Sequence, residues 1–359
     1  MPFVRTSKEI EKWVCQRIDD AIEASEQSNI SLIFVIRGEW GLGKTNSREI
    51  VKNVCKHRGL PFSHIRIDDL MRKAIEISQQ YNAKIFPSDA IAKAIKELFK
   101  EELDKTIGIL FIDELEGLIG LSEEKFPYNG TYVETVKAFI QFLRDIRSKD
   151  SNYARDIRGK VHLFIASTPY AYQFLMQYLH NIGYSHWLER REVIFDLRPL
   201  GRLETIDFLN SLSQVLYGVK LNELLSDKRL SVVIHTLSSG NPGVAIFLFR
   251  EIITYHMRLC KEIHGCPCIC KVTPETLIES LTKITISLPD KPATIAFDNI
   301  IAKQISEAYE PMKSILLTLL ASSSIILKNE ISKRGLTIFD VQSKLRGMGI
   351  ELVEVTAYH

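Results

Sequence analysis

Short apolar runs alternate with amphipathic stretches over the first 200 residues of the chain. Apolar runs bounded by polar residues or glycine are typical of strands buried in a parallel sheet, and apolar residues spaced three and four apart predict helices. The predicted strands cover residues 30–36, 62–67, 107–112, 161–166 and 192–197. The predicted helices cover residues 8–24, 45–57, 69–80, 88–103 and 132–146. This alternation predicts an α/β fold in which helices cover both faces of a five-stranded parallel sheet.

The pattern changes after Pro199, where helical periodicity continues without a buried strand. From about residue 291 the order becomes helix, short helix, short strand, helix and strand, which resembles a winged-helix domain. We therefore expect three domains. They are a sheet domain with an N-terminal helix over residues 1–199, a helical domain with a cysteine-rich loop over residues 200–287, and a winged-helix-like domain over residues 288–359.

Composition adds little about partners. The 359 residues carry a formal net charge of +2, which gives no strong basic field for nucleic acid. The N-terminus lacks the apolar core of a signal peptide. The most apolar segment, residues 314–327, is shorter than the roughly 20 residues of a membrane-spanning helix. We expect a cytoplasmic protein with no membrane partner.

The run Gly38-Glu39-Trp40-Gly41-Leu42-Gly43-Lys44-Thr45 stands between a predicted strand and a predicted helix. This is the complete P-loop pattern in its usual context, where glycines let backbone N–H groups face phosphate oxygens and the helix start adds its dipole. Lys44 would bridge the β- and γ-phosphates, and the Thr45 hydroxyl would hold Mg²⁺. The predicted nucleotide-binding residues are Gly38, Glu39, Trp40, Gly41, Leu42, Gly43, Lys44, Thr45 and Asn46.

A second strand of the sheet ends in two acids, Asp113 and Glu114. The carboxyl ends of parallel strands meet at one edge, so both side chains are expected beside the P-loop. Asp113 would hold Mg²⁺, and Glu114 would be the general base that activates the attacking water. An apolar strand ending in Asp-Glu is common by itself, and the preceding P-loop gives it this meaning.

From these motifs the chain resembles the AAA+ ATPases. That family places a polar sensor residue after the next strand and an arginine finger before the fifth, and the resemblance therefore implies Ser167 or Thr168 as sensor 1. It implies Arg190 and Arg191 as the finger that acts on a neighbouring subunit in a homo-oligomer, with Arg198 as a second candidate. Without the family, Ser167-Thr168-Pro169 is a turn and the arginines are solvated charges.

The segment Ser239-Gly240-Asn241-Pro242-Gly243 opens a predicted helix and is similar to the sensor 2 helix of the initiator-type branch. Gly243 departs from that motif, which often carries an arginine there. A helix cap explains the same residues without any functional role.

The resemblance to origin-recognition and initiator-type ATPases, and to related archaeal, mobile-element and defence ATPases, implies ATP with Mg²⁺ as ligand. It implies a DNA-associated ATPase that switches assembly or engagement of double-stranded DNA. Lys333, Arg334, Lys344 and Arg346 of the winged-helix-like domain are available for DNA phosphates. The alternative is a nucleotide-dependent signalling or defence switch, or a scaffold, whose winged helix docks a protein.

Two further features stay open. Cys260, Cys266, Cys268 and Cys270 cluster near His256 and His264, but their spacing is not a common zinc pattern, so a metal site, a disulfide and free thiols all remain alternatives. The aromatic segment of residues 125–129 is either a contact loop for a partner or a segment that packs on its own domain.

Overall fold

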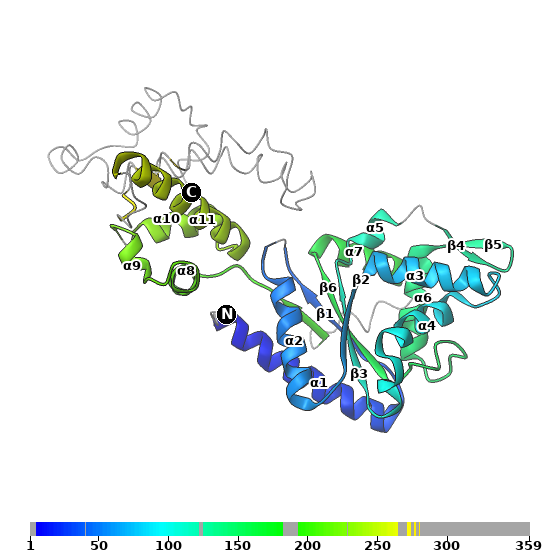
Figure 1. Cartoon of the computed structure of the whole chain (residues 1–359). Coiled ribbons are helices and arrows are strands. Elements are labelled where there is room, and N and C mark those ends of the chain that lie inside the picture. The colour runs from blue at the N-terminus through cyan, green and yellow to red at the C-terminus, as the bar shows by residue number, and fades with distance from the viewer. Residues whose placement is uncertain are drawn as a thin grey trace. The chain divides into compact units, whose positions relative to one another are not determined.

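A computed structural model describes residues 5–39, 41–121, 125–181, 193–227, 229–264, 271–273, 276–277 and 280. The chain divides into two compact units, with the boundary between Arg198 and Pro199. The first unit contains the sheet, and the described part of the second is built mainly from helices (Figure 1). The predicted winged-helix-like domain, residues 288–359, lies outside the described residues.

The first unit contains the predicted five-stranded parallel sheet. Its strands are β1 (Ile33–Arg37), β2 (Phe62–Arg66), β3 (Gly108–Asp113), β6 (Val161–Ser167) and β7 (Ile194–Asp196), in the order β2-β3-β6-β1-β7. The register places Arg37 opposite both Ser167 and Asp196, and Arg66 opposite Asp113. Polar residues from all five strands therefore end at the same edge of the sheet, as parallel pairing requires.

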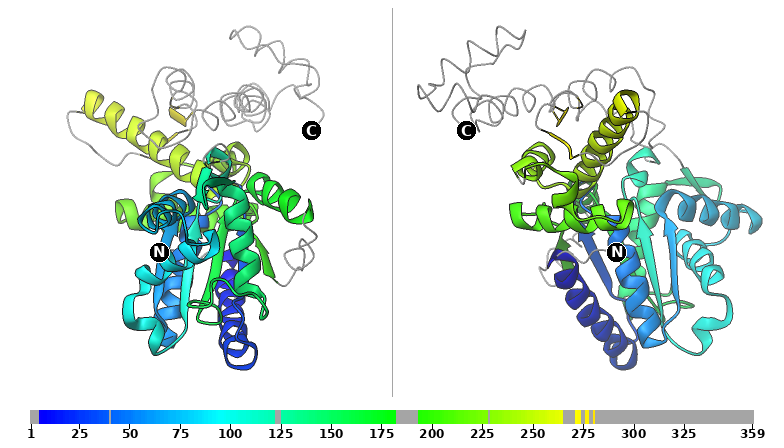
Figure 2. Two further views of the ribbon diagram at one scale, coloured as in Figure 1. Left: turned by 90° about the vertical axis from the view of Figure 1, so that its right-hand side faces the viewer. Right: turned by 60° about the vertical axis from the view of Figure 1, so that its left-hand side comes forward.

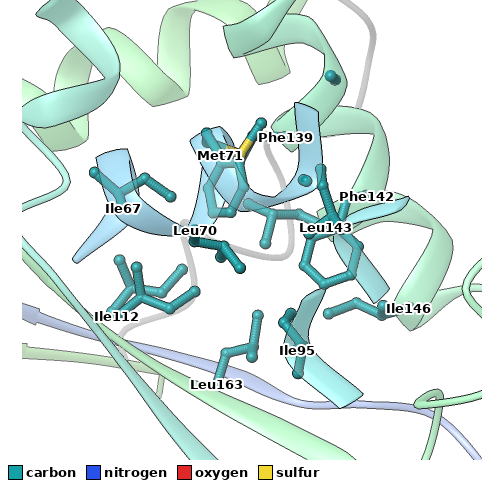
Figure 3. Packing of buried hydrophobic residues seen from close by; sticks show 14 of the residues in the cluster. Ile67, Leu70, Met71, Ile95, Ile112, Phe139, Phe142, Leu143, Ile146 and Leu163 are labelled. Carbon is teal, nitrogen blue, oxygen red and sulfur yellow. The ribbon is translucent and has the colours of Figure 1, made fainter. Parts of the chain in front are cut away.

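Helices cover both faces of this sheet (Figure 1). Along β1, Ile33 and Val35 point to one face and Phe34 and Ile36 to the other, because successive side chains of a strand alternate. One face carries α1 (Arg5–Ser28) and α2 (Lys44–Arg58). The other carries α3 (Ile67–Gln80), α4 (Pro87–Phe99), α6 (Thr135–Arg147) and α7 (Pro169–Asn181). Figure 3 shows apolar side chains of α3, α4 and α6 packed with Ile112 and Leu163 of the sheet.

A two-stranded antiparallel hairpin, β4 (Lys125–Tyr128) and β5 (Thr131–Glu134), precedes α6. The helix predicted over residues 132–146 therefore begins later, at Thr135. The turn between β4 and β5 contains Asn129 and Gly130, with φ of 46° and 74°. This is the left-handed geometry that Asn-Gly favours in hairpins. Phe126 is fully buried in this hairpin and Tyr128 packs edge-on against Phe86. The aromatic segment of residues 125–129 thus packs on its own domain.

The second unit contains α8 (Arg202–Tyr217), α9 (Leu221–Leu224), α10 (Arg229–Ser238) and α11 (Pro242–His264), the long yellow-green helix of Figure 2. Its own core includes Leu209, Leu230, Phe249 and Ile252. The helical periodicity predicted after Pro199 is confirmed by these four helices. In the described parts of both units, no helix is long and apolar enough to cross a membrane.

Candidate nucleotide-binding site

The predicted P-loop joins β1 to α2, and its glycines have geometric reasons. The Gly38 N–H donates to the Ser167 carbonyl at 3.0 Å, and a Cβ on Gly38 would come within 2.8 Å of Leu197 Cβ. Gly41 and Gly43 have φ of 78° and 101°, a region that L side chains rarely adopt. The loop is therefore a tight turn that needs glycine for close approach and for positive φ.

Lys44 is the first residue of α2 and is buried, with 8% of its surface exposed. Its ammonium donates to the Gly38 carbonyl at 2.7 Å and to the Glu39 carbonyl at 3.4 Å. Burial lowers the pKa of Lys44, and the negative charges of Glu116 and Asp113 oppose that shift. A positive charge is thus held at the mouth of the loop and balanced by acids from β3 and the turn that follows it.

The loop fits a phosphate chain. The first N–H groups of a helix have no intrahelical partner, and Gly43, the residue before α2, provides no side-chain cap for them. The first turn of α2 contains no acidic residue, and Thr45 lies exposed in it. These features leave backbone donors, a helix dipole and a hydroxyl for an anion and its metal ion. Asn46 is half-buried, and Trp40 lies outside the described residues.

The acidic turn after β3 lies at the same edge. The Asp113 carboxylate accepts the N–H of Glu114 at 2.9 Å, and Glu114 has φ of 55°, a costly conformation for a residue with a side chain. Arg66, at the end of β2, pairs with the Glu114 carboxylate at 2.8 Å. Burial raises the pKa of Glu114, and the Arg66 charge opposes this shift. The predicted base is therefore held by an arginine from the neighbouring strand.

The two sensor 1 candidates follow β6. The buried Ser167 hydroxyl donates to the Thr168 carbonyl at 2.8 Å. Thr168 caps α7, since its hydroxyl accepts the Ala171 N–H at 3.2 Å, and its own N–H donates to the Glu116 carboxylate at 2.6 Å. Both hydroxyls thus make local contacts, and the segment is bonded to the P-loop through Gly38 and to the acidic turn through Glu116.

Other predicted residues lie elsewhere. Arg190 and Arg191 lie outside the described residues, whereas Arg198 pairs with Glu9 at 3.9 Å. In the second unit, the Asn241 side chain accepts the N–H groups of Gly243 and Val244 and so caps α11. This capping gives the Ser239–Gly243 segment a structural role.

The cysteine cluster is described only in part. Cys260 is buried in α11, with its Sγ 3.5 Å from His256 Nε2. Cys266, Cys268 and Cys270 lie outside the described residues. Within the described ranges, no group of three or more His, Cys, Asp or Glu side chains could hold a metal ion.

Two charged residues of the site were missed by the sequence reasoning. Glu116 belongs to the run Asp113-Glu114-Leu115-Glu116, and this third acid was a visible signal. Arg66 had no such signal, because only the pairing of β2 with β3 brings it opposite Asp113 and next to Glu114.

A five-stranded parallel sheet, a glycine loop on its central strand and a buried lysine at the following helix start define the class of P-loop domains. Residues 34–176 match the family described as ATPase family associated with various cellular activities (AAA). This part of the chain is thus similar to the AAA family.

Similar solved structures are of low sequence identity. ORC1 of Aeropyrum pernix in complex with DNA is 14% identical, over 94% of this chain and 83% of that chain, with a TM-score of 0.46. Drosophila ORC bound to DNA is 12% identical, over 99% and 77%, with a TM-score of 0.45. Domain III of the Thermotoga maritima replication initiation protein DnaA is 15% identical, over 75% and 90%, with a TM-score of 0.41. No curated protein matches the chain.

Proposed function

We propose that this protein binds ATP with Mg²⁺ at the P-loop and hydrolyses it. The observation that carries the proposal is the meeting, at one sheet edge, of a buried lysine on a glycine loop with the acidic turn of β3, whose carboxylates oppose the pKa shift of Lys44. A lysine, helix-start N–H groups and an acid pair from the next strand are the parts that phosphoryl transfer uses.

The proposed roles follow from the chemistry of each side chain. Lys44 and the first N–H groups of α2 bind the β- and γ-phosphates. Thr45 and Asp113 would hold Mg²⁺, which supplies charge to the phosphate oxygens when it is bound. Glu114 orients the attacking water and accepts its proton while the oxygen bonds to the γ-phosphorus and ADP leaves. Ser167 or Thr168 would sense the γ-phosphate, and Arg190 and Arg191 would act on a neighbouring subunit.

The decisive experiment compares ATP turnover by the wild type and by Glu114→Gln, with and without duplex DNA. We expect turnover to fall by roughly 10²- to 10⁴-fold in the variant, because the amide cannot accept the proton. ATP affinity should persist, since Glu114 does not belong to the P-loop. Equal turnover by the two proteins would refute the assigned base.

We further propose that the nucleotide state controls engagement of double-stranded DNA through residues 288–359. The sequence of that region supports this step, with four basic residues available for phosphates. Duplex DNA affinity of the full chain should weaken as salt rises, and should weaken strongly when Lys333, Arg334, Lys344 and Arg346 are replaced by alanine. Affinity that ignores both changes would remove DNA from the proposal.

One observation favours the second candidate, a nucleotide-dependent switch that docks a protein and turns over slowly. Arg66 occupies the carboxylate of Glu114 at 2.8 Å, and a base held in an ion pair is less able to receive a proton. If Arg66→Ala raises basal turnover several-fold while DNA binding is undetectable, the slow switch is the better account.

A further inference from the structure

A continuous chain of hydrogen bonds runs through the Ser167–Thr168 peptide group. On one side its carbonyl accepts the Gly38 N–H at 3.0 Å. On the other side its N–H donates to the Glu116 carboxylate at 2.6 Å. A single rigid peptide plane therefore connects the P-loop with the acidic turn, and a shift of either end moves the other.

The Glu116 carboxylate has one oxygen in this chain and one outside it. Oε1 accepts the Thr168 N–H, whereas Oε2 is buried and has no hydrogen-bond partner among the described residues. A buried carboxylate oxygen without a partner is costly unless a positive charge lies near. Glu116 itself is half-buried, and its negative charge opposes the lowering of the Lys44 pKa that burial causes.

The same chain of hydrogen bonds reaches Lys44 of the P-loop. The Lys44 ammonium donates to the Gly38 carbonyl at 2.7 Å, and Gly38 is the residue whose N–H reaches Ser167. Glu116 therefore acts on Lys44 by charge and on Gly38 by hydrogen bonds relayed through Thr168. The turn that follows β3 holds Glu116 in place, since the Leu115 N–H donates to the Ala166 carbonyl at 3.3 Å and Leu115 is buried.

We propose that Glu116 is a positioning residue of the site, whose hydrogen bond holds the Ser167–Thr168 peptide group in place beside the P-loop. The inference rests on the proposed function and deepens it. The Glu116 carboxylate supplies both an acceptor oxygen and a negative charge, and this role needs only the acceptor oxygen.

Two substitutions separate these parts. Glu116→Gln removes the charge and keeps an oxygen that can accept the Thr168 N–H, while Glu116→Ala removes both. Glu101→Gln, at an exposed acid of the 3₁₀ segment Lys100–Asp104, is the matched control. For kcat, Glu116→Gln should stay within about twofold, and Glu116→Ala should fall about tenfold with the lost hydrogen bond to a charged acceptor.

One measurement needs no turnover. Amide hydrogen exchange at Thr168 should accelerate about tenfold in Glu116→Ala and stay unchanged in Glu116→Gln, since only the first loses the acceptor. A global loss of fold would instead accelerate exchange everywhere and lower the melting temperature.

The outcomes are distinct. Equal kcat for the Gln and Ala variants, or unchanged Thr168 exchange in Glu116→Ala, would each overturn the role of Glu116. If the wild type neither binds nor hydrolyses ATP, the proposed function fails, while the exchange result still decides whether Glu116 holds Thr168.

Discussion

Buried polar groups lie near both ends of strand β6, but their hydrogen-bond partners differ. The segment that leads into β6, residues 148–160, binds back onto the domain. Asp145 accepts hydrogen bonds from Ser88 at 2.6 Å and Ser151 at 2.8 Å, and Arg158 donates to the carbonyls of Ser148 and Ser151. At the other end, Ser167 and Thr168 connect separate loops that carry Lys44, Glu114 and Glu116.

This difference shows how one parallel sheet divides its polar groups between stability and chemistry. Hydrogen bonds at the incoming end close on residues of the same domain, so they fix a long loop that has no helix or strand. At the outgoing end, an arginine and an acid face a loop of N–H donors, and Glu114 adopts a costly backbone conformation with φ of 55°. Strain and partly balanced charge are typical of functional edges.

The largest expected effect comes from a substitution near the outgoing end of β6, where the P-loop lies. In Lys44→Ala, ATP turnover should fall about 1000-fold, in the range that loss of one preorganised donor causes. The melting temperature in the absence of nucleotide should change little, because α2 keeps its apolar contacts with the sheet. Lys93→Ala, a lysine that contacts Tyr81 far from the loop in sequence, is the control. Steady-state turnover and thermal unfolding measure the two effects.

The next largest effect is a loss of stability, caused by a substitution near the incoming end of β6. Asp145→Ala should lower the free energy of unfolding by about 3 kcal/mol, because the buried Ser88 hydroxyl and the half-buried Ser151 hydroxyl lose a charged acceptor. Asp150→Ala, at an exposed neighbour, should change it by less than about 0.5 kcal/mol. Denaturant unfolding measures both, and ATP affinity at a temperature where the variant is folded should stay at the wild-type value. Altered affinity would show that the two ends are coupled.

The smallest expected effect is a change in the pH dependence of turnover, caused by a substitution near the outgoing end of β6. Arg66 stabilises the ionised form of Glu114, so Arg66→Gln should raise the pKa of this carboxyl further above its ordinary value. A general base works only when it is deprotonated, and the acidic limb of the turnover profile should therefore move to higher pH. Both side chains are partly exposed, and solvent screening keeps this pKa shift small. Arg48→Gln should leave the limb in place, since Arg48 pairs with Glu49 instead.

Local sequence predicted much of the fold because each element has its own signal. Apolar runs marked the five strands, and spacing marked the helices on either face of the sheet except α7, which was not predicted. The hairpin of residues 125–134 was missed, because its strands are too short for a clear period and one was joined to the next helix. The Asn129-Gly130 turn was the available signal. In strands of only four residues, too few positions alternate to separate a strand from the start of the next helix.

The sequence by itself determined the P-loop, the acid pair after β3 and the AAA+ resemblance, since these depend on consecutive residues whose chemistry is local. The tertiary structure alone decided that Arg66 holds Glu114 and that Glu116 holds the Thr168 N–H. Those contacts join segments distant in the chain, and they exist because parallel pairing brings the ends of β2, β3 and β6 to one edge. A motif can state which groups are present, but only strand order and register state which groups meet.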